Sequence, residues 1–122
     1  MSQGTKSWST KISSSDALIF VTPQYNWGYP AALKNAIDHL YTEWAMKPAL
    51  IVTYGGHGGT KCAAQLRQVL TVVKMRLAVT MPSLVFSREL VEANTGNIDA
   101  DAEFSEYRSM VQDGLRELDA LL

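Results

Sequence analysis

The sequence is poor in cysteine, in long apolar runs and in any excess of one charge. Its one cysteine, Cys62, cannot form an intramolecular disulfide framework. Its apolar runs, such as residues 17–21, are far too short to span a bilayer, and the first fifteen residues lack the apolar segment of a signal peptide. We therefore expect a cytoplasmic protein with no membrane partner.

The charges exclude another class of partner. Eleven basic and twelve acidic residues give the 122-residue chain a net charge of -1, without the basic patch typical of nucleic-acid binding. Hydrophobic residues make up 47% and charged residues 19%, which is the balance of a globular domain. We expect one folded domain and no nucleic-acid partner.

Side chains for acid–base, nucleophilic or metal chemistry are also scarce. The sequence shows no metal-ligand cluster, no Ser-His-Asp arrangement and no carboxylate pair placed for hydrolysis. His39 is expected on a helix surface, His57 in a solvated loop and Cys62 as inert packing. We therefore assign no catalytic residue and no metal ligand, a pattern that fits chemistry carried by a cofactor.

Hydrophobic patterning predicts strands that alternate with helices. Residues 17–22 and 49–53 are apolar, β-branched runs typical of strands buried on both faces, and a third short strand is predicted at 77–81. Helical spacing predicts helices over 31–43, around Leu66, Val69, Leu70 and Val73, and from Phe104 to Leu122. This alternation indicates an α/β fold with a parallel sheet.

Three shorter segments complete the chain. Trp8 and Ile12 lie four residues apart, which favours the tail of a helix over a frayed terminus. Asn94, Gly96 and Asn97 are interpreted as a turn.

Two unusual loops follow the first two predicted strands, where ligands bind in open parallel sheets. The first loop offers aromatic faces and amides that suit a planar ligand, although its aromatics could instead only cover the edge of the core. The second has four glycines around His57, more than a tight strand-to-helix turn requires. If the strands are neighbours, both loops line one cleft.

These loops carry a resemblance to a known family. Residues 22–38, Thr-Pro-Gln-Tyr-Asn-Trp-Gly-Tyr-Pro-Ala-Ala-Leu-Lys-Asn-Ala-Ile-Asp, resemble the signature of the NADPH-dependent FMN reductases and related quinone reductases and azoreductases. Residues 54–59, Tyr-Gly-Gly-His-Gly-Gly, are similar to the second flavin loop of that family, and Met46-Lys47-Pro48 stands at its Gly-Lys-Pro. Within the family, the sequence looks most like the fungal and yeast quinone reductases.

The resemblance implies a flavodoxin-like three-layer α/β fold with strand order 2-1-3-4-5, FMN and NAD(P)H as cofactors, and a small-molecule quinone or flavin as electron acceptor. It also implies a homodimer, with the helix at 31–43 near the subunit contact. The residues that would hold the flavin ring are Pro23, Gln24, Tyr25, Asn26 and Trp27 on one side and Tyr54, Gly55 and Gly56 on the other.

The chain also departs from the family pattern. The strand at 17–22 corresponds to the third family strand, so residues 1–122 form a partial domain with strands 3–5 and lack the first two βα units and the loop that grips the FMN phosphate. We expect an open edge at this strand and weak or no FMN binding by this chain alone. Met46 replaces a glycine and is expected to adopt a left-handed conformation at some cost.

Two other functions remain open. The chain could be a truncated, non-catalytic remnant that acts through protein contacts with a full-length relative. A one-electron flavodoxin-type carrier is less favoured, since such carriers tend to be acidic and lack this pair of loops.

Overall fold

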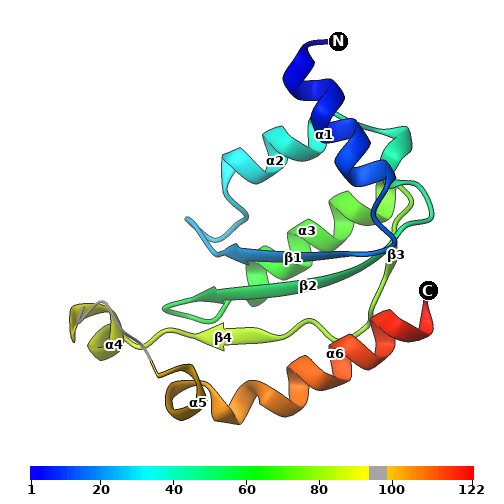
Figure 1. Cartoon of the computed structure of the whole chain (residues 1–122). Helices are drawn as coiled ribbons and strands as arrows, with labels where there is room; N and C mark the ends of the chain where they lie inside the picture. The colour runs from blue at the N-terminus through cyan, green and yellow to red at the C-terminus, as the bar shows by residue number, and fades with distance from the viewer. Residues whose placement is uncertain (94–98) are drawn as a thin grey trace.

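A computed structural model describes residues 1–93 and 99–122 (Figure 1). Its sheet contains β1 (Leu18–Pro23), β2 (Pro48–Gly55), β3 (Arg76–Leu77) and β4 (Ser83–Val85). β1 pairs in parallel with one side of β2, and β3 and β4 pair in parallel with the other side. The parallel α/β architecture is therefore confirmed, whereas the turn at Asn94, Gly96 and Asn97 lies outside the described residues.

Helices cover both faces of this sheet (Figure 1). The helices α1 (Gln3–Ser13), α2 (Ala31–Asp38) and α3 (Thr60–Val72) pack on one face, and α6 (Arg108–Ala120) packs on the other. The shorter elements are the 3₁₀ turn Thr42–Trp44, α4 (Arg88–Ala93), α5 (Ala100–Glu103) and the 3₁₀ turn Ser105–Tyr107. Among the described helices, none is both long and apolar enough to cross a membrane.

The helix tail predicted around Trp8 is confirmed as α1. Ser2 caps its first turn by accepting a hydrogen bond from the backbone N–H of Thr5 at 3.1 Å. The Trp8 indole donates to the carbonyl of Ala36 at 2.8 Å, and Ile12 is buried against the sheet. These contacts fix α1 on α2, so the segment is part of the domain and not a frayed end.

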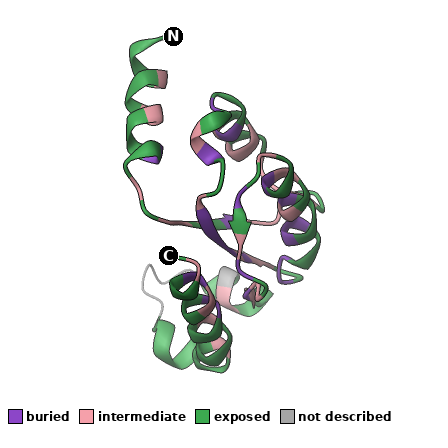
Figure 2. Ribbon diagram, turned by 90° about the vertical axis from the view of Figure 1, so that its right-hand side faces the viewer, coloured by how far each residue is buried: buried purple, intermediate pink, exposed green. Residues whose placement is uncertain are grey.

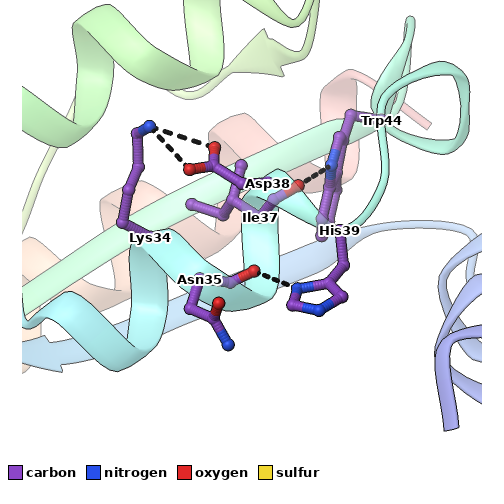
Figure 3. Close-up of polar contacts among 6 residues, drawn as sticks. All are labelled: Lys34, Asn35, Ile37, Asp38, His39 and Trp44. Carbon is purple, nitrogen blue, oxygen red and sulfur yellow. Dashed lines mark hydrogen bonds and ion pairs between the residues drawn. The ribbon is translucent and has the colours of Figure 1, made fainter.

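The helix predicted over 31–43 is too long, because α2 ends at Asp38. The Trp44 indole folds back and donates to the carbonyl of Ile37 at 3.1 Å (Figure 3). The Ile37 carbonyl also accepts from the backbone N–H of Leu40 at 3.1 Å, and Trp44 is fully buried. Burial of a tryptophan therefore outweighs continuation of the helical pattern.

The exposed face of α2 carries local polar contacts, as expected for His39 (Figure 3). The His39 ring donates from Nδ1 to the carbonyl of Asn35 at 2.6 Å. Lys34 pairs with Asp38 at 3.0 Å.

The strand predicted at 77–81 is wrong, because the chain bulges there between β3 and β4. The register passes from Ala49↔Leu77 to Thr53↔Ser83, so four steps along β2 face six steps along its partner. The backbone N–H of Thr80 donates instead to Glu117 Oε1 at 2.8 Å. A carboxylate from α6 thus replaces the missing strand partner.

The last helix also begins later than predicted. Phe104 has φ -119° and ψ 16°, outside the helical region, and α6 starts at Arg108. The helix approaches β2 closely at Gly114, where an added Cβ would lie 2.8 Å from Leu50 Cδ1.

The expectation that the first strand is buried on both faces is wrong. Ile19 is 49% exposed and Val21 is 64% exposed, whereas the central strand β2 is buried along most of its length (Figure 2). The reason is that α6 packs over β2, and within residues 1–93 and 99–122 nothing covers this face of β1 or pairs with its outer side. The predicted open edge is therefore confirmed.

Candidate functional site

The two predicted loops lie side by side at the carboxyl ends of β1 and β2 (Figure 1). Pro23 is opposite Tyr54 in the register, and the backbone N–H of Gln24 donates to the carbonyl of Tyr54 at 2.9 Å. The loops therefore share one edge of the sheet, which is the place where parallel sheets bind ligands.

Gln24 ties the first loop to the helix that follows the second. Its Oε1 accepts from the backbone N–H groups of Lys61 and Cys62, at 3.1 and 3.0 Å. Gly59, at the N-cap of α3, has no side chain to supply such a cap, so Gln24 provides it from a distant point in the sequence. This bond positions the loops relative to each other.

The first loop contains a tight turn at residues 25–28. Tyr25 and Gly28 exchange two backbone hydrogen bonds of 2.8 and 2.9 Å. The central residues Asn26 and Trp27 have φ of 47° and 72°, as in a type I′ turn. Asparagine tolerates this conformation, but tryptophan is rare in it, because its Cβ is crowded by the following carbonyl.

The turn at residues 25–28 leaves two aromatic rings exposed to solvent. Trp27 is 57% exposed and Tyr25 is 60% exposed, which argues against an aromatic loop that only covers the core. Gln65 Nε2 donates to the carbonyl of Trp27 at 3.1 Å and helps to hold the strained residue. Strain that persists beside an exposed ring is typical of ligand-binding sites.

Most of the glycines in the second loop have steric explanations. Gly58 has φ of 83°, and an added Cβ at Gly59 would lie 2.3 Å from the buried Thr53 Oγ1. A Cβ at Gly55 would lie 2.9 Å from the Gly58 carbonyl oxygen. At Gly56, in contrast, an added Cβ meets no atom within 4 Å, so the fold itself does not require this glycine.

Polar side chains surround the Trp27 ring. Lys61 Nζ lies 5.6 Å from its centroid, and the exposed His57 ring lies 6.4 Å away at an angle of 61°.

Cys62 behaves as predicted, because its side chain is buried and burial raises the pKa of its thiol, against a smaller opposing effect of Thr22. The thiol therefore packs in the core, and its raised pKa disfavours the reactive thiolate.

The sequence analysis missed an aromatic stack beside the second loop. The ring of Phe86 lies 5.0 Å from that of Tyr54 and 4.9 Å from that of Phe104. The backbone N–H of Phe86 donates to the carbonyl of Gly55 at 2.9 Å. Phe86 could have been found from its place directly after a strand that ends at the same edge of the sheet. Phe104 had been assigned to the face of a helix.

This arrangement suits a flat, polar aromatic ligand. It joins exposed aromatic rings on one loop to an unobstructed glycine on the other. Such a surface offers stacking, backbone hydrogen bonds and room for a ring system lying against the chain. The isoalloxazine ring of FMN has this chemistry, so the residues present fit that group.

Comparison with known proteins decides the family. The model of the family described as NADPH-dependent FMN reductase matches residues 1–90, which include both loops. The chain belongs to this family. An NAD(P)H-dependent FMN reductase of Schizosaccharomyces pombe is 50% identical over 117 residues, which cover 96% of this chain and 58% of that protein. An NAD(P)H-dependent FMN reductase of Saccharomyces cerevisiae is 64% identical over 73 residues, 60% of this chain and 38% of that protein.

A solved structure supports the same conclusion about this member of the FMN reductase family. The flavoenzyme FerB, an NAD(P)H:acceptor oxidoreductase of Paracoccus denitrificans, superposes with a TM-score of 0.68 at 26% identity. The match covers 98% of this chain and 66% of FerB. The expected flavodoxin-like fold is therefore confirmed, and the chain spans less than two thirds of each of these relatives.

Proposed function

We propose that the chain is the flavin-ring-binding part of an FMN-dependent NAD(P)H oxidoreductase that reduces a quinone or a free flavin. The observation that carries this proposal is that the loop of the strained, exposed Trp27 lies beside the loop of Gly56, a glycine that the fold does not need; the Trp27 ring is 6.4 Å from that of His57, the residue after Gly56. Membership of the FMN reductase family and the names of the relatives support it. The alternative of a non-catalytic remnant has no comparable support.

In this proposal the two loops hold opposite sides of the isoalloxazine ring. The residues on the first loop are Pro23, Gln24, Tyr25, Asn26 and Trp27, and those on the second are Tyr54, Gly55 and Gly56. Gln24 fixes the spacing of the loops through its hydrogen bonds to α3, while Gly56 leaves room for the ring. Bound FMN would supply two-electron hydride chemistry, and the chain's own residues would bind and orient the ring.

We also propose that residues 1–122 form a partial flavodoxin-like domain, with β1, β2 and β4 as family strands 3, 4 and 5. The order β1-β2-β4 is compatible with that assignment. A cytoplasmic homodimer with α2 near its contact remains part of the proposal. The homodimer is supported by two large apolar side chains that are exposed beyond the end of α2, Tyr41 and Met46.

Flavin titration and turnover together test the proposed function. Since the site residues named here face the ring and not the phosphate, FMN and riboflavin are expected to bind with similar affinity, weaker than micromolar. NADPH oxidation in the presence of a quinone should increase with added FMN. If quenching of flavin fluorescence shows no binding of either flavin, and FMN produces no rate above a protein-free control, the proposal is wrong.

A further inference from the structure

We propose that Lys61, assisted by His57, binds a phosphate group of the reducing nicotinamide dinucleotide. This inference deepens the proposed function and depends on it, because it names the contact for the hydride donor at the same site. It starts from Lys61, a cation beside the exposed ring of Trp27 that was not among the expected site residues.

The charge of Lys61 is available to a ligand. In residues 1–93 and 99–122, no carboxylate oxygen lies within 4.0 Å of its Nζ, whereas Lys34, Arg88, Arg108 and Arg116 each pair with an aspartate or glutamate. The backbone N–H groups of Lys61 and Cys62 already donate to Gln24. The capacity to bind an anion therefore resides in the Lys61 side chain and not in the helix end.

The neighbouring rings give this cation a defined place. Lys61 Nζ lies 5.6 Å from the centroid of the Trp27 ring, and the His57 ring lies 6.4 Å from the same centroid. The turn at residues 25–28 holds Trp27, and the His57 imidazole can add a hydrogen-bond donor. An aromatic rim with a positive charge thus forms from Trp27 of the first loop, His57 of the second loop and Lys61 in the first turn of α3.

The exposure of this rim favours the dinucleotide over the flavin as the source of the phosphate. An ion pair between exposed groups contributes only about 0.2–1 kcal/mol, which suits a ligand that must leave after each turnover. Lys61, His57 and Trp27 are all exposed, so a ligand can reach them from solvent. The phosphate could be the 2′-phosphate of NADPH or the pyrophosphate that NADH and NADPH share, and the experiment separates these.

The test uses the 122-residue chain and needs no flavin. Adenosine, ADP and adenosine 2′,5′-bisphosphate are titrated while amide and indole signals of the protein are followed by NMR. The variants are Lys61→Ala, Lys61→Arg and, as a matched control, Lys6→Ala, which removes an exposed lysine from the first turn of α1. FMN and riboflavin are titrated in parallel.

We expect Lys61→Ala to lower the affinity for phosphate-bearing nucleotides by up to about fivefold and to leave the affinity for adenosine unchanged. Lys61→Arg should retain most of the nucleotide affinity. Loss of affinity for both nucleotides identifies the pyrophosphate, because both carry a phosphate at the 5′ position where the dinucleotide has its pyrophosphate. Loss of affinity for the bisphosphate alone identifies the 2′-phosphate. The proposal is overturned if wild type binds adenosine as tightly as it binds both ADP and the bisphosphate, if Lys61→Ala leaves both nucleotide affinities unchanged, or if Lys6→Ala causes the same loss. It is also overturned if Lys61→Ala lowers the affinity for FMN relative to riboflavin and leaves the nucleotide affinities unchanged. Failure of wild type to bind any flavin would instead refute the proposed function.

Discussion

Trp27 is held in a backbone conformation that glycine adopts more easily, and this strain can be measured. Trp27→Gly and Trp27→Ala both remove the ring and its contacts with Lys61 and His57. They differ only in the backbone, which has φ of 72° at this position. A comparison of the two variants therefore isolates the strain.

The expected difference has an unusual sign. In a helix or strand, alanine is more stable than glycine by about 0.5–1 kcal/mol, because glycine loses more conformational freedom on folding. A left-handed conformation costs a residue with a Cβ about 1–2 kcal/mol. The strain energy of the left-handed conformation is larger than the entropic cost of glycine. Trp27→Gly should therefore be more stable than Trp27→Ala by up to about 1 kcal/mol, or about 4 °C in Tm.

Urea unfolding provides the assay, followed by the fluorescence of the two remaining tryptophans. Trp44 is fully buried and Trp8 is partly buried against it, so both report on the core. Both variants should bind flavin more weakly than wild type, and to the same extent, because each lacks the ring. Equal stabilities, or a more stable alanine variant, would refute the argument that this turn is strained.

Other substitutions test further parts of the account. Gly56→Ala should change stability by less than about 0.5 kcal/mol yet weaken flavin binding, whereas Gly59→Ala should destabilise the fold by about 1–3 kcal/mol, as measured by urea unfolding and flavin titration. Met46 has φ of 64° and is exposed, so Met46→Gly should raise stability by up to about 1 kcal/mol, and a lower Tm would contradict this. Hydrogen bonds from the Thr80 hydroxyl and N–H lower the pKa of Glu117, so its contribution to stability is complete above the unfolded pKa and is lost as pH falls through the lower folded pKa. The stability difference between wild type and Glu117→Gln should therefore shrink as the solution is acidified below the ordinary glutamate range, and a constant difference would count against it.

Local patterns predicted the parts of the fold that depend on neighbouring residues. The apolar runs at 17–22 and 49–53 are strands, and the loops after them meet, because parallel neighbours end at the same sheet edge. The left-handed conformation of Met46 was also expected, and it is confirmed by its φ of 64°. In these cases a short stretch of sequence contains the physical cause.

The features that sequence reasoning missed depend on distant partners. The strand expected at 77–81 is interrupted because Glu117 supplies the partner of Thr80 from α6. The helix end at Asp38 depends on the burial of Trp44. Glu117 is 37 positions from Thr80, and Trp44, although close to Asp38 in the sequence, is packed by the rings of Trp8 and Phe20 from α1 and β1.

The site was predicted unevenly for the same reason. The resemblance named the loop residues, but the role of Gln24 as the cap of α3 requires the three-dimensional fold. The count of four glycines suggested ligand binding, whereas the structure leaves only Gly56 without a steric explanation.

Mapping of flavin contacts by NMR tests the central claim most directly. During titration of the chain with FMN, the Trp27 indole signal and the backbone amides of residues 24–27 and 54–57 should shift together and saturate at one dissociation constant. Signals from the apolar groove of about 230 Å³ beside β1, which Trp8 and Ile19 line, should stay unchanged. Shifts confined to that groove, or shifts in only one of the two loops, would contradict a flavin ring held between them.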